Sequence, residues 1–283
     1  MQLGQREPGS TGQNPAGREA CPTLAAVSYL NTAPLVWGMK YGPQQADFAL
    51  EACVPSECAR RVETGLADLG IVPVAEIQRQ GLSTIPGTGI ACRGEVRSIL
   101  LVSKVEPHRI RTLAADSGSR TSVRLARIIL REQFGAEPST FEHAPALETM
   151  LAEADAALLI GDAALRVDIA TLPYVCLDLG AEWHRLTGLP MVFAMWAGRP
   201  DRVSRWDLES LETSFSGSLD FGLARLDEIV AREAALRHFP ARLVHEYLTS
   251  HILFRIGRAE QEGLTAFYEL SAMLRSETTP SIL

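Results

Sequence analysis

Four segments of this 283-residue chain share one arrangement: a short apolar run, then a polar or small-residue corner, then a helix-like pattern. The apolar runs begin at residues 24, 69, 113 and 157, and the corners after them begin SYLN, PVAE, SGSR and GDAA. Strands that alternate with helices are typical of α/β proteins, whose ligands bind beyond the carboxyl ends of the strands. We therefore predict an α/β fold in which all four corners can face one site. Each corner, taken alone, is equally well explained as an ordinary turn that caps a helix.

Two long apolar stretches, residues 89–104 and 188–198, bracket a central block of the chain, and the pattern after residue 200 is helical. A chain that leaves one lobe, builds a second and returns is typical of a hinged, two-lobed binder with its ligand in the cleft. We predict a first lobe of residues 22–98 plus 197–283 and an inserted second lobe of residues 99–196. Each lobe is expected to contain a mixed sheet flanked by helices.

Composition excludes several classes of protein. The net charge of −7 and the pI of about 5.5 argue against nucleic-acid binding, which requires a basic face. No apolar run approaches the roughly 20 residues of a membrane span. Residues 1–21 are polar, rich in Gly, Pro and Gln, and lack the apolar stretch of a secretory signal, so we expect a disordered tail. The five cysteines form no CxxC pair, which favours reduced thiols in a cytoplasmic protein without a metal site.

The first corner carries more hydrogen-bonding groups than a turn needs. Ser28, Tyr29 and Asn31 follow an apolar strand and precede a helix that begins near Pro34. We predict that these three side chains form one wall of the ligand site.

The third corner has the features of an anion site. Ser119 is a candidate N-cap, and Arg120, Thr121 and Ser122 occupy the first helical turn, where acidic residues are more usual. Free backbone N–H groups, hydroxyls and a guanidinium at a helix N-terminus suit a carboxylate or a phosphate. Because the chain has no Gly-rich phosphate loop, we favour a carboxylate. The alternative is a capped surface helix with a solvent-facing arginine.

The starts of two further predicted helices are weaker candidates for ligand binding. Ser56 follows Pro55 at one of them, and Asp162 lies near the cap of the other; simple capping explains both equally well. The chain has no GxSxG, HExxH or phosphate-loop motif, and its six histidines are scattered. The site is therefore expected to be a binding cleft that uses no metal and no cofactor.

Six stretches of the chain, in order, resemble the chorismate dehydratases of the futalosine route to menaquinone: AVSYLNTAPLVWGM, VPSECARRVETGLADLGIVPVAEI, GIACRGEVRSILLVS, DSGSRTSVRLARIIL, ALLIGDAAL and DLGAEWHRLTGLPMVFAMW. The resemblance runs from about residue 23 to about residue 270. It implies the type II periplasmic-binding-protein fold, which agrees with the lobe-in-lobe pattern.

The resemblance also implies an activity, a hydro-lyase reaction that converts chorismate to 3-[(1-carboxyvinyl)oxy]benzoate. In that scheme Asn31 is the expected catalytic residue, and Ser28 and Tyr29 shape the same wall. The third corner, residues 119–122, is expected to hold a substrate carboxylate. Ser56, Ser98 and Asp162 are the remaining binding candidates. The expected partner is the small substrate alone, with the protein a monomer or a homodimer.

Two alternatives stay open from the sequence. One is a non-catalytic cytoplasmic protein that binds small carboxylates, since this fold serves mainly solute capture. A transport receptor of that class is expected to carry an export signal, and a sensor a signalling domain. The other alternative is the sister dihydroxynaphthoate synthase, whose N-terminal motif differs from SYLN.

Overall fold

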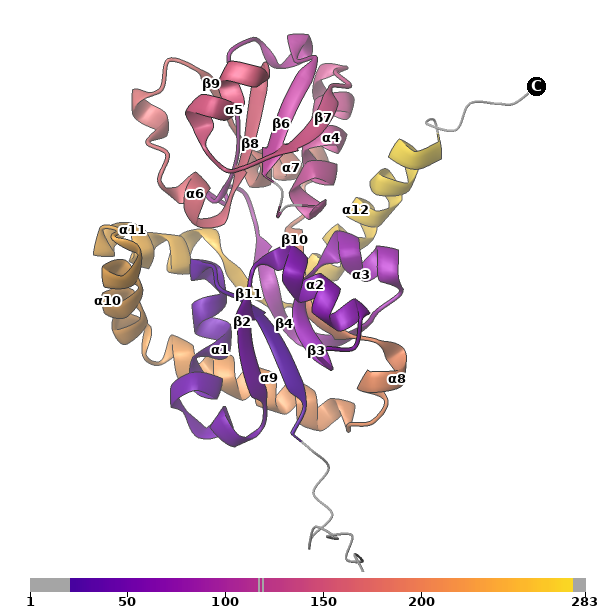
Figure 1. The fold of residues 1–283 in the computed structure, drawn as a ribbon, viewed down its shortest axis with the longest axis vertical. Coiled ribbons are helices and arrows are strands. Elements are labelled where there is room, and N and C mark those ends of the chain that lie inside the picture. The colour runs from indigo at the N-terminus through magenta and orange to yellow at the C-terminus, as the bar shows by residue number, and fades with distance from the viewer. Residues whose placement is uncertain (1–20, 117, 119, 277–283) are drawn as a thin grey trace, which may run out of the picture.

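The computed structural model describes residues 21–116, 118 and 120–276, and the expected tail therefore lies almost wholly outside the described residues (Figure 1). Two lobes lie one above the other in Figure 1, each built on one mixed sheet with helices against it. The prediction of a two-lobed α/β fold is confirmed.

Six strands form the first sheet, in the order β11-β4-β10-β3-β1-β2. Their bounds are β1 (Thr23–Val27), β2 (Ala49–Cys53), β3 (Leu69–Pro73), β4 (Ser83–Cys92), β10 (Met191–Gly198) and β11 (Leu253–Ile256). Strand β1 pairs in parallel with β2 and β3, whereas β10 runs antiparallel between β3 and β4.

Five strands form the second sheet, in the order β7-β6-β8-β5-β9. Their bounds are β5 (Ile99–Ser103), β6 (Thr112–Asp116), β7 (Ser139–His143), β8 (Ala156–Ile160) and β9 (Val175–Asp178). Strands β6, β7 and β8 are parallel, and β5 is antiparallel to β8 and β9. The four apolar runs of the sequence are β1, β3, β6 and β8, two in each sheet.

Helices cover both sheets, and α12 extends from the first lobe along the second (Figure 1). Their bounds are α1 (Ala33–Tyr41), α2 (Pro55–Glu63), α3 (Val74–Gln80), α4 (Arg120–Phe134), α5 (Leu147–Glu153), α6 (Gly161–Leu165), α7 (Leu179–Thr187), α8 (Pro200–Val203), α9 (Leu208–Leu223), α10 (Leu226–Arg237), α11 (Ala241–Glu246) and α12 (Arg258–Ser276). Within the described ranges, none of these helices is both long and apolar enough to cross a bilayer.

The chain crosses between the sheets twice. The stretch 89–104 is two strands, because β4 ends in the first sheet and β5 begins in the second. The backbone between them is held by Asp178, whose carboxylate accepts the N–H groups of Val96 (3.0 Å) and Arg97 (2.6 Å). The return crossing precedes β10, which pairs with β3 and β4. The expected boundary at residue 196 falls inside that strand, so we propose that the second lobe ends near residue 190.

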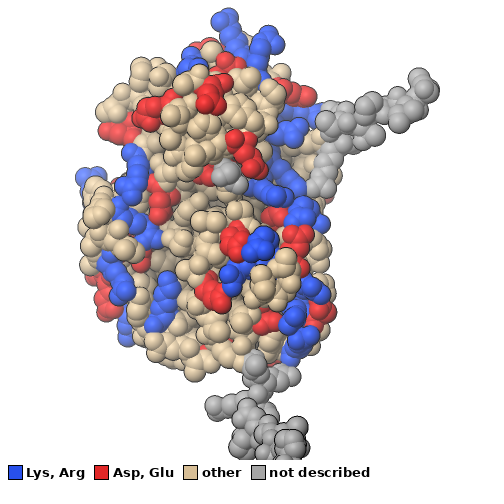
Figure 2. Space-filling view, in the orientation of Figure 1, with Lys and Arg blue, Asp and Glu red and all other residues tan. Residues whose placement is uncertain are grey.

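Aromatic stacking and close helix packing stabilise the first lobe. The ring of Phe215, on α9, stacks between Trp196 (4.5 Å) and Phe48 (5.0 Å). Helix α9 lies so close to α1 that a Cβ atom at Gly222 would come within 2.4 Å of the Pro34 carbonyl oxygen. Glycine is therefore required there for the approach of the two helices. On the surface, acidic and basic side chains are mixed across the face shown in Figure 2.

Candidate functional site

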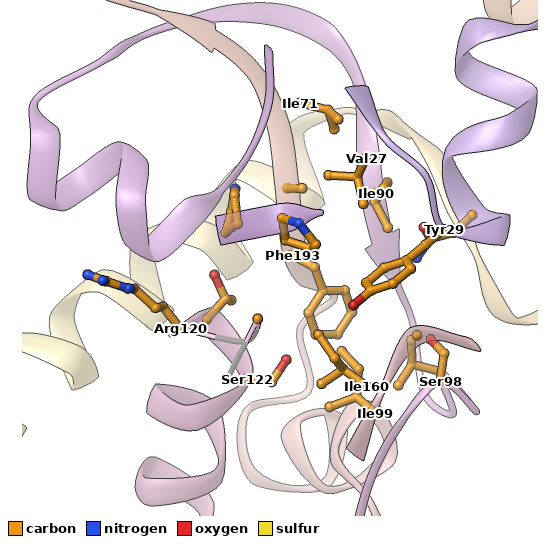
Figure 3. A pocket seen from close by; sticks show the side chains of 18 residues that line it. Val27, Tyr29, Ile71, Ile90, Ser98, Ile99, Arg120, Ser122, Ile160 and Phe193 are labelled. Carbon is orange, nitrogen blue, oxygen red and sulfur yellow. The ribbon is translucent and has the colours of Figure 1, made fainter. Parts of the chain in front are cut away.

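A cavity lies between the two sheets, and residues of all four corners line it (Figure 3). We call it the interlobe cavity. The corners after β1, β3, β6 and β8 contribute, respectively, Asn31, Pro73, Ser122 and Gly161, among others. The four corners therefore converge on one cavity, as the sequence pattern predicts.

The first corner is held in place from the second lobe. Strand β1 ends at Val27, and a short 3₁₀ turn (Leu30–Thr32) leads into α1. The N–H of Leu30 donates to the Asp162 carboxylate (3.2 Å), and the Arg237 guanidinium donates both to that carboxylate (2.8 Å) and to the Ser28 carbonyl oxygen (2.6 Å). The position of Asn31 in the wall of the cavity therefore depends on contacts between the lobes.

Tyr29 reaches across the cleft. Its ring contacts Gly161 at the start of α6, and Figure 3 shows its hydroxyl directed into the interlobe cavity. Burial, together with the charges of Asp116 and Asp162, raises the pKa of Tyr29 to about 12. The phenol is therefore a neutral hydrogen-bond donor at physiological pH.

Replacing Gly161 with Ala is expected to disturb the site strongly. The residue has a φ of +56°, and an added Cβ would lie 2.9 Å from ring atoms of Tyr29. Both the left-handed backbone and the clash oppose a side chain there, at a cost of about 1–3 kcal/mol. We expect kcat/KM for the substrate to fall at least about tenfold, the factor that corresponds to 1.4 kcal/mol. Gly94→Ala is the control, since Gly94 also has a positive φ but has open space around it. Equal activity in the two variants would contradict the clash.

The N-terminus of α4 opens into the interlobe cavity from the second lobe. Ser122 is buried, and Thr121 accepts a hydrogen bond from the N–H of Ala75 on α3 (3.2 Å). Arg120 is 57% exposed and pairs with the buried Glu76 carboxylate of α3 at 3.3 Å. The first N–H groups of a helix have no intrahelical acceptor, so this end is suited to a carboxylate. The predicted N-cap, Ser119, lies outside the described residues.

Apolar side chains from both lobes line the rest of the cavity. Figure 3 shows Val27, Ile71 and Ile90 on one side, Ile99 and Ile160 on the other, and Phe193 between them. Such walls suit an apolar ring, and Tyr29, Asn31, Ser98 and the start of α4 supply polar groups beside them.

Three of the predicted site residues lie outside the lining. Ser28 is exposed, and its hydroxyl donates to the Cys53 carbonyl oxygen (3.3 Å). Ser56 is exposed on α2, whose N-cap is Val54, and it borders a neighbouring charged hollow; Pro55 lines the cavity in its place. The carboxylate of Asp162 is occupied by Leu30 and Arg237, so its role is to join the lobes.

The sequence gives no indication of two residues near the cavity, namely Arg237 and Tyr247. Arg237 and Tyr247 belong to the C-terminal helices, whose apolar period indicated only packing. Tyr247 begins a π-helical turn (Tyr247–His251), a rare irregularity that is often found at functional sites. The sequence shows no signal for such a turn.

The sequence profile of the family described as menaquinone biosynthesis matches residues 22–273. The chain belongs to this family. One curated relative, the chorismate dehydratase of Thermus thermophilus, is 30% identical over 268 residues, which cover 87% of this chain and 93% of the relative. The chorismate dehydratase of Campylobacter jejuni is 26% identical over 175 residues, which cover 60% of this chain and 65% of that protein.

Solved structures similar to this family member show the same fold. Protein AF1704 of Archaeoglobus fulgidus has a TM-score of 0.70 at 15% identity, and the match covers 89% of this chain and 97% of that one. The alkanesulfonate-binding protein of Xanthomonas axonopodis pv. citri has a TM-score of 0.66 at 15% identity, and the match covers 92% and 95% of the two chains. The similar structures also include the periplasmic aliphatic sulphonate binding protein of Escherichia coli, with a TM-score of 0.58 at 13% identity over 88% of this chain and 86% of that one. All of these likenesses extend to the fold and not to the ligand.

Proposed function

We propose that this protein is a cytoplasmic chorismate dehydratase, which removes water from chorismate to give 3-[(1-carboxyvinyl)oxy]benzoate for menaquinone synthesis. Family membership and the Thermus thermophilus relative support the assignment. The observation that carries it is the composition of the interlobe cavity, which combines an apolar slot for a ring with polar groups at its ends.

The lining contains no strong base. Among its described residues there is no Asp, Glu, His, Lys or Cys, and its two ionisable side chains are Tyr29 and Arg120. Tyr29 is neutral at physiological pH and Arg120 is cationic. The proton acceptor is therefore assigned to the substrate itself, through its enolpyruvyl carboxylate.

The reaction needs little from the protein besides position and polarity. The C3–H bond of chorismate breaks and its electron pair enters the ring; the C4–O bond breaks and its electron pair leaves with hydroxide. The C3 proton is acidified by conjugation through the ring double bond to the C1 carboxylate. Departure of hydroxide makes the ring aromatic, and the proton and hydroxide together leave as water. The protein holds the carboxylates, stabilises developing negative charge and excludes bulk water.

We assign the named residues to these tasks. The start of α4, with Arg120 and Ser122, holds a substrate carboxylate. Asn31 and Ser98 face the reacting edge of the ring, where their donor groups stabilise the departing hydroxide. Tyr29 closes the wall between the lobes and keeps the ring in register.

A pH profile tests the absence of a protein base. Because substrate carboxylates ionise near pH 4 and Tyr29 has a pKa of about 12, kcat should vary less than about twofold between about pH 6 and about pH 9. The measurement is kcat at saturating chorismate across that range. A bell-shaped profile with a limb near pH 7 would instead require a histidine or another titrating protein group.

Incubation of purified protein with chorismate separates an enzyme from a binder. Catalytic amounts of the protein should convert the substrate progressively into an aromatic product, which is followed by ultraviolet absorbance against a protein-free control. A binder of the same fold would instead saturate with unchanged chorismate at one equivalent, and that outcome would overturn the assignment.

A further inference from the structure

We propose that Tyr247 is a positioning residue whose phenol sets the directions of the Ser98 hydroxyl and the Asn31 amide. Its kinetic consequence depends on the function proposed above, whereas its effect on the two side chains does not. Tyr247 does not line the interlobe cavity; it lies behind the wall that Ser98 and Asn31 form.

The phenol is fully enclosed at the junction of the two lobes. Tyr247 is 1% exposed, and its hydroxyl donates to the Ser98 Oγ at 2.9 Å. Tyr247 comes from the π-helical turn after α11, whereas Ser98 ends the crossover into β5. The hydrogen bond therefore joins the C-terminal part of the chain to a residue of the site.

One phenol oxygen serves both side chains. Burial raises the pKa of Tyr247 well above that of a free tyrosine, while hydrogen bonds with Ser98 and Asn31 partly offset the rise. A protonated phenol has one O–H, which goes to Ser98, so its oxygen is left to accept from the Asn31 amide, whose interaction with the phenol lowers the phenol's pKa. Ser98 then keeps its own proton for the cavity. The Asn31 amide keeps a second N–H as a donor for the ligand, and its Oδ1 is buried with no partner among the described residues.

The backbone of Ser98 does not need this phenol. Its carbonyl oxygen accepts the N–H of Gly161 (2.8 Å), and its own N–H donates to the Val96 carbonyl oxygen (2.7 Å). Tyr247 instead fixes the rotation of the Ser98 side chain, through the hydrogen bond to its Oγ. Removing the hydroxyl should therefore disorder the donors of the site while leaving the fold in place.

The test compares Tyr247→Phe with Tyr268→Phe. Tyr268, on α12, donates its phenol hydrogen to the Val74 carbonyl oxygen (3.1 Å) and does not line the cavity. Losing one orienting hydrogen bond should lower kcat about tenfold in Tyr247→Phe, with KM changed less than about twofold. Tyr268→Phe should keep the wild-type kcat. In a Ser98→Ala background, Tyr247→Phe should lower kcat by a smaller factor than in the wild-type background, because one of the two groups that Tyr247 orients is gone.

An NMR measurement tests the positioning role of Tyr247 independently of turnover. The side-chain amide resonances of Asn31, assigned by their loss in Asn31→Ala, should shift in Tyr247→Phe and stay in place in Tyr268→Phe. Ser98→Ala removes the hydrogen bond between Tyr247 and Ser98 from its other end, and it should also shift the Asn31 amide resonances. This variant tests the proposal if Tyr247→Phe does not fold. Unmoved resonances, or a wild-type kcat in Tyr247→Phe, would overturn the positioning role. A wild-type protein that is inactive on chorismate would overturn the proposed function alone.

Discussion

Replacing Asn31 with Ala should lower kcat by about 10²- to 10³-fold, the usual loss when a donor to a developing anion is removed. The dissociation constant for chorismate should change less than about fivefold, because the start of α4 and the apolar slot still bind the substrate. Asn31 lies at the tip of the first corner, and its amide oxygen is buried without a partner among the described residues. Steady-state kinetics together with calorimetric binding to the variant measure the two effects separately.

Gln261→Ala is the matched control for this variant. It removes an amide of similar size from the exposed face of α12, outside the lining of the cavity. Its kcat should equal that of the wild type. Near-normal turnover in Asn31→Ala, or a loss confined to binding, would remove Asn31 from the chemical step.

Replacing Arg237 with Met should destabilise the whole protein. Arg237 pairs with Asp162 of the second lobe and with Glu233 on its own helix, and it donates to the Ser28 carbonyl oxygen. Its side chain is 12% exposed and that of Glu233 is 9% exposed, so the variant leaves carboxylates poorly solvated without their cation. Breaking a buried pair from one side costs about 3 kcal/mol, which corresponds to a fall in Tm of about 6–12 °C. Thermal unfolding followed by circular dichroism measures it.

The same substitution at Arg258 is the control. Arg258 forms an i,i+4 pair with Glu262 but is 93% exposed, so Arg258→Met should change the free energy of unfolding by less than about 0.5 kcal/mol. Since Arg237 also anchors the first corner, its variant should lose activity at temperatures where it is still folded. An unchanged Tm in Arg237→Met would show that the lobes are joined without this contact.

Local patterns in the sequence predict much of this fold. The apolar runs at β1, β3, β6 and β8 are buried strands, and the polar residues after them meet because parallel strands present their carboxyl ends at one edge. Residues 120–122 predict a helix N-terminus that suits an anion, and α4 begins there. These features depend on residues that are close together in the sequence, so one sequence is enough to predict them.

Contacts between distant segments are what the sequence does not display. The sequence indicates that Asp162 caps a helix, yet its carboxylate pairs with the Arg237 guanidinium, 75 positions away. The sequence pattern predicts that Tyr247 packs as part of an apolar helical stripe. A π-helical turn instead places its phenol against Ser98, 149 positions away. The lobe boundary expected at residue 196 falls inside β10, because an apolar run does not reveal which sheet it joins.

Proton NMR of chorismate incubated with a catalytic amount of the protein tests directly whether the protein removes water from chorismate. We expect that signals of the cyclohexadiene ring give way to those of a meta-substituted aromatic ring, while the two vinylidene protons of the enolpyruvyl group persist. Those signals together report loss of water with the ether intact. Unchanged chorismate, or an aromatic product formed with release of pyruvate, would show that the protein does not catalyse this dehydration.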